Sequence, residues 1–145
     1  MGAPSKQAFA IAGLLAAVLG VAGCGETVST SSFSGEGHAV AERISSFQRH
    51  ATEASEGNIC KDDVSAHLKQ TLKAAHSSCA EALKEQLKQV EDVSLSVKSI
   101  SVHGTSAAAR VQSTWSGKTC VSTLLLEREG KAWKIAGSQA GICAG

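Results

Sequence analysis

The sequence has no tyrosine, and its 145 residues include only three phenylalanines and two tryptophans. A chain without tyrosine has no phenol that could act as a general acid or hold an oxyanion. Excess positive charge is lacking too, because the formal net charge is only +1 at pH 7. A nearly neutral chain lacks the positive field that attracts phosphate backbones, so we exclude nucleic acid as a partner.

A long apolar run occurs only at the amino terminus. Lys6 is the only charged side chain in residues 1–23, and an uninterrupted run of apolar and small residues extends from Ala8 to Gly23. This run is shorter than the roughly 20 residues that a membrane-spanning helix requires. A basic start and a small-residue end are typical of an export signal. We therefore expect residues 1–23 to be a signal peptide.

The apolar run ends in Val21-Ala22-Gly23-Cys24, which resembles the bacterial lipobox. In that motif an aliphatic residue and two small residues precede the cysteine whose thiol takes the lipid, and the acyl chains then hold the protein at the membrane. The assignment also explains the odd number of cysteines, since five cannot all pair within one molecule. The alternative is an ordinary secretory signal with an unmodified cysteine. We expect Cys24 to be the lipid attachment site, on the extracytoplasmic face of the cell membrane.

The segment that follows Cys24 is poor in bulky apolar residues. Residues 24–37 are rich in serine and glycine, a composition typical of a flexible tether. Residues 38–145 are long enough for one domain with a single core. Without the signal peptide, basic and acidic residues are equal in number. We therefore expect a lipidated tether followed by one nearly neutral domain.

Three helices are predicted in the first half of this domain. Apolar residues recur at helical spacing over residues 37–54, and this helix is expected to end at Gly57-Asn58. A second, shorter helix over residues 61–72 would have Asp62 or Asp63 as its cap. A third begins at Ser78-Cys79-Ala80-Glu81, where a serine followed three residues later by glutamate is typical of a capping box.

From Val93 onward the apolar residues alternate with a period of two, which predicts strands. The alternation slips by one residue between Val97 and Ile100, as expected for a β-bulge. Segments 106–115, 120–129 and 132–139 predict three further strands. The predicted fold is α+β, with three amino-terminal helices packed on one face of a bent four-stranded antiparallel sheet.

This layout and the terminal hairpin LLLEREGKAWKIAG, residues 124–137, resemble the nuclear transport factor 2-like superfamily, whose fold is a cystatin-like α+β roll. The chain is similar, more narrowly, to small bacterial lipoproteins of that superfamily. In these a cysteine after the first helix and another opening the third helix recur, as Cys60 and Cys79 do here. The resemblance covers His38 to about Gln139. It implies a cone-shaped pocket between helices and sheet, in a superfamily that includes enzymes, carriers and protein-binding modules.

Four cysteines remain for pairing once Cys24 is assigned to the lipid, and they allow three connectivities. Cys60 and Cys79 flank the second predicted helix, so a bond between them would join it to the third. Cys120 begins the third predicted strand, and Cys143 can reach it if the tail folds back. We predict these two disulfides, since disulfides persist outside the reducing cytoplasm. The alternative, a zinc site of four thiolates, lacks any CxxC spacing.

The histidines are the other candidates for a metal site. They stand at positions 38, 50, 67, 76 and 103, and no two of them are four residues apart or form an HExxH pattern. The helical pattern places His50 and His67 at exposed positions. We interpret the histidines as solvated and predict neither a metal nor another cofactor.

The enzymes that the resemblance brings into consideration combine an acid or base in the pocket with a tyrosine or a second carboxylate. The core-facing strand positions here carry neither Asp nor Glu. His103 lies near a strand end, where we expect it to serve the turn, and no GxSxG pattern is present. We therefore predict no enzyme activity and no catalytic residue.

Two binding functions remain. The first is a lipid-anchored, extracytoplasmic adaptor that contacts another envelope component through the solvent face of the sheet, where we place Arg110 and Lys134. The second is a carrier that holds a small apolar ligand in a pocket lined by Val111, Trp115 and Trp133. The alternative for the two tryptophans is that they fill the core, because bulky side chains are scarce.

Overall fold

The computed structural model describes residues 28–75, 78–88, 94–115 and 117–144, without the side chain of Trp115. The chain forms α1 (Gly35–Thr52), α2 (Glu56–Asn58), the π-helical segment η1 (Ile59–Asp63), α3 (Ala66–Ala75) and α4 (Cys79–Leu87), and then β1 (Ser94–His103), β2 (Ser106–Trp115), β3 (Lys118–Glu129) and β4 (Ala132–Ala144). The predicted signal peptide, the lipid site Cys24 and His76 lie outside the described residues.

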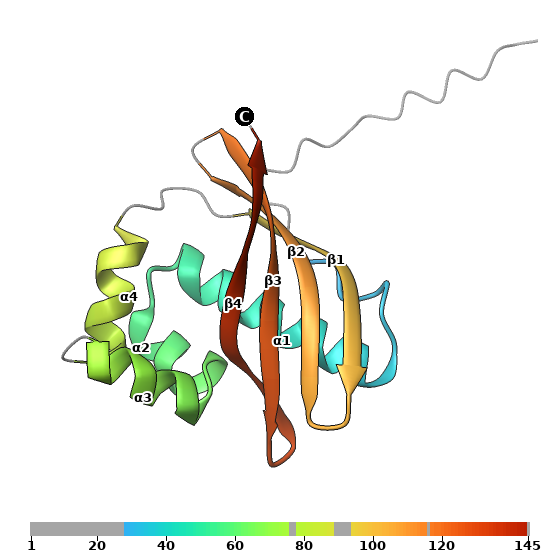
Figure 1. Cartoon of the computed structure of the whole chain (residues 1–145), viewed down its shortest axis with the longest axis horizontal. Helices are drawn as coiled ribbons and strands as arrows, with labels where there is room; N and C mark the ends of the chain where they lie inside the picture. Colours follow the sequence, from blue (N-terminus) through green and yellow to red (C-terminus); the bar gives the residue numbers. More distant parts are fainter. Residues whose placement is uncertain (1–27, 76–77, 89–93, 116, 145) are drawn as a thin grey trace, which may run out of the picture.

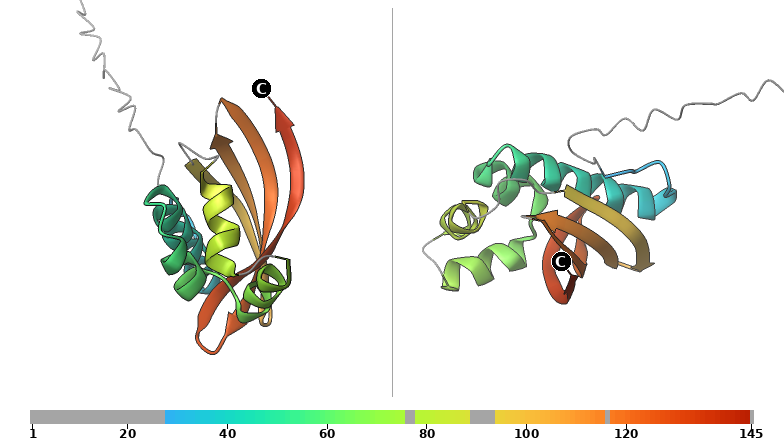
Figure 2. Two further views of the ribbon diagram at one scale, coloured as in Figure 1. Left: turned by 90° about the vertical axis from the view of Figure 1, so that its left-hand side faces the viewer. Right: turned by 90° about the horizontal axis from the view of Figure 1, so that it is seen from above.

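The four strands form one antiparallel sheet in the order β1-β2-β3-β4 (Figure 1). The helices lie on one side of this sheet, which bends strongly, as the two views of Figure 2 show. The predicted α+β class and the order of helices before strands are confirmed. The predicted bulge in β1 is confirmed as well, since the register shifts between Val97 and Ser99.

One hydrophobic core lies between α1 and the sheet. Its most deeply buried members come from α1, from η1 and from β2, where alternate alanine and valine side chains face the helix. The folded domain begins earlier in the sequence than predicted. Val28 lies in the segment that we expected to be a tether, yet it is buried, and α1 starts at Gly35. None of the described helices is both long and apolar enough to span a membrane. The buried core residues are Val28, Val40, Ile44, Ala51, Ile59, Val64, Leu83, Leu95, Ala107, Ala109, Val111, Leu126, Trp133 and Ile135.

The helix ends differ from the predictions in one region. The first helix was expected to end at Gly57-Asn58, but α1 ends at Thr52. Asp63 does not cap the next helix, because its carboxylate faces α1; instead the Ser65 hydroxyl accepts the backbone N–H of Leu68 at 3.1 Å. The predicted cap of α4 is confirmed, since the hydroxyl of Ser78 accepts the N–H of Glu81 at 3.1 Å.

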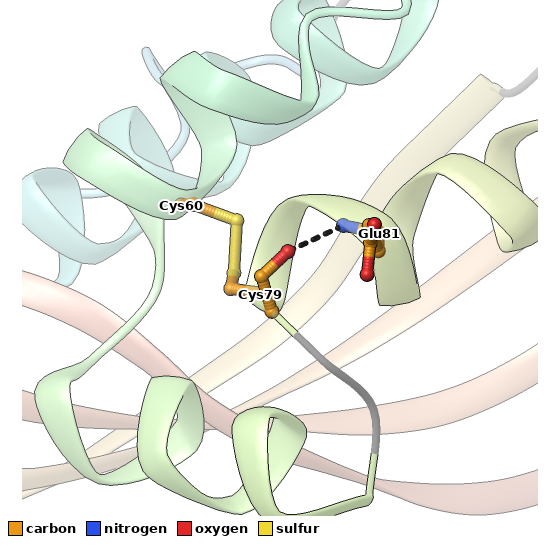
Figure 3. Close-up of a disulfide and its surroundings, with 4 residues drawn as sticks. Cys60, Cys79 and Glu81 are labelled. Atoms are coloured by element: carbon orange, nitrogen blue, oxygen red, sulfur yellow. Dashed lines mark hydrogen bonds between the residues drawn. A yellow bond between two sulfur atoms is a disulfide. The ribbon is translucent and has the colours of Figure 1, made fainter.

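Both predicted disulfides are present. Cys60 in η1 is bonded to Cys79 at the start of α4, so the bond ties these two elements together (Figure 3). Cys120 is bonded to Cys143, its direct partner across the β3–β4 ladder. No fold-back of the tail is needed for this bond, because β4 continues past residue 139, where the predicted strand ended, to Ala144 and carries Cys143 to Cys120 without a turn.

Candidate functional site

A buried carboxylate lies at the junction of α1, η1 and β4. The side chain of Asp63 is fully buried and faces three donors from α1. Arg43 Nη1 lies 3.0 Å from Oδ1, the hydroxyl of Ser46 donates to the same oxygen at 2.7 Å, and His50 Nδ1 lies 2.6 Å from Oδ2. A buried charge is costly unless it is paired and hydrogen-bonded, and Asp63 has both kinds of partner.

The three donors share one face of α1 because they are spaced by three and four residues, which places side chains above one another on a helix. The prediction that His50 is exposed was wrong: it is buried against Asp63. The spacing of Arg43, Ser46 and His50 marks a polar stripe on one face of α1, but it does not show whether that stripe faces solvent or a buried partner.

The chain around Asp63 also docks on the outer edge of β4. Val64 forms a parallel bridge with Ile135, and the N–H of Ser65 donates to the carbonyl of Ile135 at 2.9 Å. From α1, Arg43 Nε donates to the carbonyl of Trp133 at 2.8 Å. The buried cluster therefore fixes α1 and η1 to the beginning of the last strand.

Lys134 belongs to this junction as well. Its ammonium group donates to the carbonyl of Asp62, and burial, reinforced by the nearby charge of Arg43, lowers the pKa of Lys134 below its ordinary value. Lys134 alternates with the buried Trp133 and Ile135, so it lies on the predicted side of the sheet, but it is half-buried and bonded to η1. Arg110 of β2, in contrast, is exposed.

The geometry around His50 shows what the cluster does. A carboxylate bonded to one ring nitrogen can orient an imidazole for proton transfer. Here, however, the nearby hydroxyl of Ser46 donates to the carboxylate and not to the imidazole. The arrangement satisfies a buried charge and positions three elements, without aligning Ser46 as a nucleophile.

Two of the three expected pocket residues lie in the core. Val111 and Trp133 are 1% and 3% exposed and belong to the same hydrophobic cluster. The indole Nε1 of Trp133 donates to Glu36 Oε2 at 2.7 Å, and the guanidinium of Arg128 lies 6.0 Å from the centre of the ring. The side chain of Trp115 lies outside the described part of the chain. Trp133 thus fills the core and anchors the start of α1.

A more accessible part of the helix-facing side of the sheet lies farther along β2, β3 and β4. Ser122 of β3 pairs with the buried Val111 of β2, so Ser122 faces the helices. Leu124 lies two residues farther along β3 and pairs with Ser138 of β4, so both of these residues face the same side. Ser113, Ser122 and Leu124 are half-buried and Ser138 is exposed. In Figure 1 the ends of β3 and β4 extend beyond α1. We call Ser113, Ser122, Leu124 and Ser138 the half-open surface.

Comparison with protein families matches residues 51–138 to a family described as putative lumazine-binding. This match covers more than half of the chain. The chain belongs to the putative lumazine-binding family. The matched segment of this lumazine-binding-like chain runs from the end of α1 to the middle of β4, so it includes the half-open surface and Asp63. Comparison with curated proteins gives no match.

Solved structures show which fold the chain has. It resembles a nuclear transport factor 2-like protein of unknown function from Shewanella baltica, with 15% identity, a TM-score of 0.50 and coverage of 71% of this chain and 90% of that one. A second such protein of unknown function, from Silicibacter pomeroyi, has 13% identity, a TM-score of 0.51 and coverage of 69% and 89%. The predicted nuclear transport factor 2-like fold is confirmed.

The remaining histidines in the described part of the chain lie apart from one another. His67 and His103 are exposed, and a ring nitrogen of His103 lies 2.9 Å from the hydroxyl of Ser101. His38 Nδ1 lies 3.0 Å from the carbonyl of Thr30. Within the described ranges, no three His, Cys, Asp or Glu side chains gather as a metal site does.

Proposed function

We propose that the protein is a lipid-anchored, extracytoplasmic domain that binds a small ligand, with apolar and hydrogen-bonding groups, at the half-open surface. The observation that carries this proposal is membership in a family described as putative lumazine-binding, with a matched segment that contains Ser113, Ser122 and Leu124. Small-molecule sites combine apolar walls with a few polar groups that fix the orientation of the ligand. The half-open surface offers this combination, since serine hydroxyls flank Leu124 beside the apolar core.

Lumazine itself is the first probe. Binding to the full chain, extracted from membranes in detergent, is measured by isothermal titration and by native mass spectrometry. Ser122→Trp places an indole on the half-open surface and should weaken binding about tenfold or more, since lost contacts of about 1.4 kcal/mol have that effect. Thr123→Trp is the matched control, because the next residue of a strand points to the opposite face.

Equal binding by Ser122→Trp and Thr123→Trp contradicts this location. If lumazine does not bind, protein purified from its own host is examined by native mass spectrometry for a retained small molecule. A chain that neither binds lumazine nor carries such a molecule is not a ligand carrier.

The anchoring part of the proposal rests on the lipobox that ends at Cys24. Cys24→Ser removes the thiol that takes the lipid, so the variant should leave the membrane fraction or remain as an uncleaved precursor. Membrane fractionation and intact-mass measurement decide the matter. A variant that fractionates with the membrane and migrates like the parent chain contradicts acylation.

A second candidate function is an adaptor that contacts another envelope protein. It is favoured by Arg110, an exposed charge on the side of the sheet opposite to its buried neighbours Ala109 and Val111. Arg110→Glu should impair the cellular role in a complemented deletion strain, whereas Arg110→Lys, which keeps the charge, should not. His103→Ala should have no effect. A silent Arg110→Glu variant contradicts the adaptor function.

A further inference from the structure

The two edges of the sheet differ in how they are protected. Natural edge strands carry charged residues, prolines or bulges that prevent pairing with another strand. The edge strand β1 has the exposed Lys98 at its bulge. The outer part of β4, from Gly137 to Ala144, also has an irregularity, between Gln139 and Ile142, but it carries no charged residue and no proline.

The outer edge of β4 is also uncovered along this part. The parallel bridge to Val64 occupies the edge at Ile135, and among the described residues no strand pairs with that edge farther along. Residues 138–144 are all exposed. Backbone N–H and C=O groups on this edge are therefore available to a further strand.

An apolar side chain marks the same segment. Ile142 is 84% exposed. The register of β3 and β4 shifts between Val121 and Thr123. Ile142 is the first paired residue of β4 after this shift. It pairs with Val121, and both side chains lie on the solvent side of the sheet. An isoleucine at such a position gains burial if a second strand brings a partner beside it.

We propose that two copies of the chain pair in antiparallel fashion through the end of β4, with the two-fold axis beside Ile142, so that their sheets join into one. This axis places Ile142 opposite Ile142 of the second copy. Because the segment has no charge, self-pairing opposes no like charges. The same edge of a second copy is the complementary strand that the structure itself supplies.

The test uses two full-length copies with different epitope tags, co-expressed and extracted in mild detergent. One copy is captured and the amount of the other is measured. The parent copies should co-purify. When both carry Ile142→Lys, recovery should fall about tenfold, because like charges oppose each other near the axis. One copy with Ile142→Lys and one with Ile142→Glu should restore the parent level.

Two control pairs test whether the contact involves the β4 edge. Ser101→Lys in both copies adds a charge to the exposed β1 edge, and Arg110→Glu reverses the charge on the solvent face of β2; both should leave recovery unchanged. The proposal is overturned if the parent copies do not co-purify, if the Lys and Glu pair fails to restore recovery, or if Arg110→Glu abolishes it while Ile142→Lys does not. Capture of a different protein by the parent in place of the second copy overturns it too.

Discussion

Replacing Asp63 tests whether the buried carboxylate holds the helices on the sheet. Asp63→Ala leaves Arg43 and His50 without their carboxylate partner and the hydroxyl of Ser46 without an acceptor. Breaking a buried ion pair by removing one partner costs about 3–5 kcal/mol. The side chain of Arg43 is 21% exposed and can regain some hydration, so we expect the lower end of that range, about 3 kcal/mol.

The assay is equilibrium urea denaturation followed by circular dichroism, with the disulfides intact. A loss of about 3 kcal/mol corresponds to a fall of about 10 °C in the midpoint of thermal unfolding for a domain of this size. Asp62→Ala is the matched control, because Asp62 contributes its backbone carbonyl to Lys134 and should change the free energy of unfolding by less than about 0.5 kcal/mol. A loss below about 1 kcal/mol for Asp63→Ala, in a cooperative transition, would refute the structural role assigned to the cluster.

Three further predictions concern other parts of the fold. Gly141→Ala should lower the midpoint of thermal unfolding, because a Cβ at this position would overlap the carbonyl of Val121. Gly137→Ala is the control, since the space around Gly137 is open. Equal midpoints for the two variants would contradict the close approach of Gly141 to Val121. Removing the Cys60–Cys79 bond by a double alanine substitution should cost about 3 kcal/mol in urea denaturation, since it closes a loop with a sequence separation of 19. The pKa of Lys134 is lowered in the folded state, so the unfolded chain binds more protons as the pH approaches 10.5 and the stability that depends on this residue rises with pH. Lys134→Met should remove that rise, measured by urea denaturation at a series of pH values below 10.5.

Features set by neighbouring residues could be predicted from the sequence. The cap at Ser78 depends on four consecutive residues, and the bulge near Lys98 appears as a slip in a two-residue alternation. The disulfide pairs followed from the order of the elements, since each pair joins segments that adjacent elements bring together. Such signals are contained in a short stretch of chain, so no distant partner has to be known.

The Asp63 junction could not be predicted in the same way. Whether His50 faces solvent or a carboxylate depends on the path that the chain takes after α1, and that path is a π-helical segment rather than a continued helix. The last strand posed a similar difficulty, because Gly137 and Gly141 weaken the strand pattern there. Pairing with β3 and the bond to Cys120 nevertheless keep β4 extended to Ala144.

The contacts of the first helix with the last strand set the order in which the chain can fold. Arg43 is separated by 90 residues from the carbonyl that it contacts on Trp133, and Trp133 is separated by 97 residues from Glu36. During vectorial synthesis α1 emerges long before either partner exists, and the entropy of closing so long a loop must be overcome before these bonds form. Folding is therefore completed only after β4 has emerged, and a truncation that removes β4 deprives α1 of both contacts.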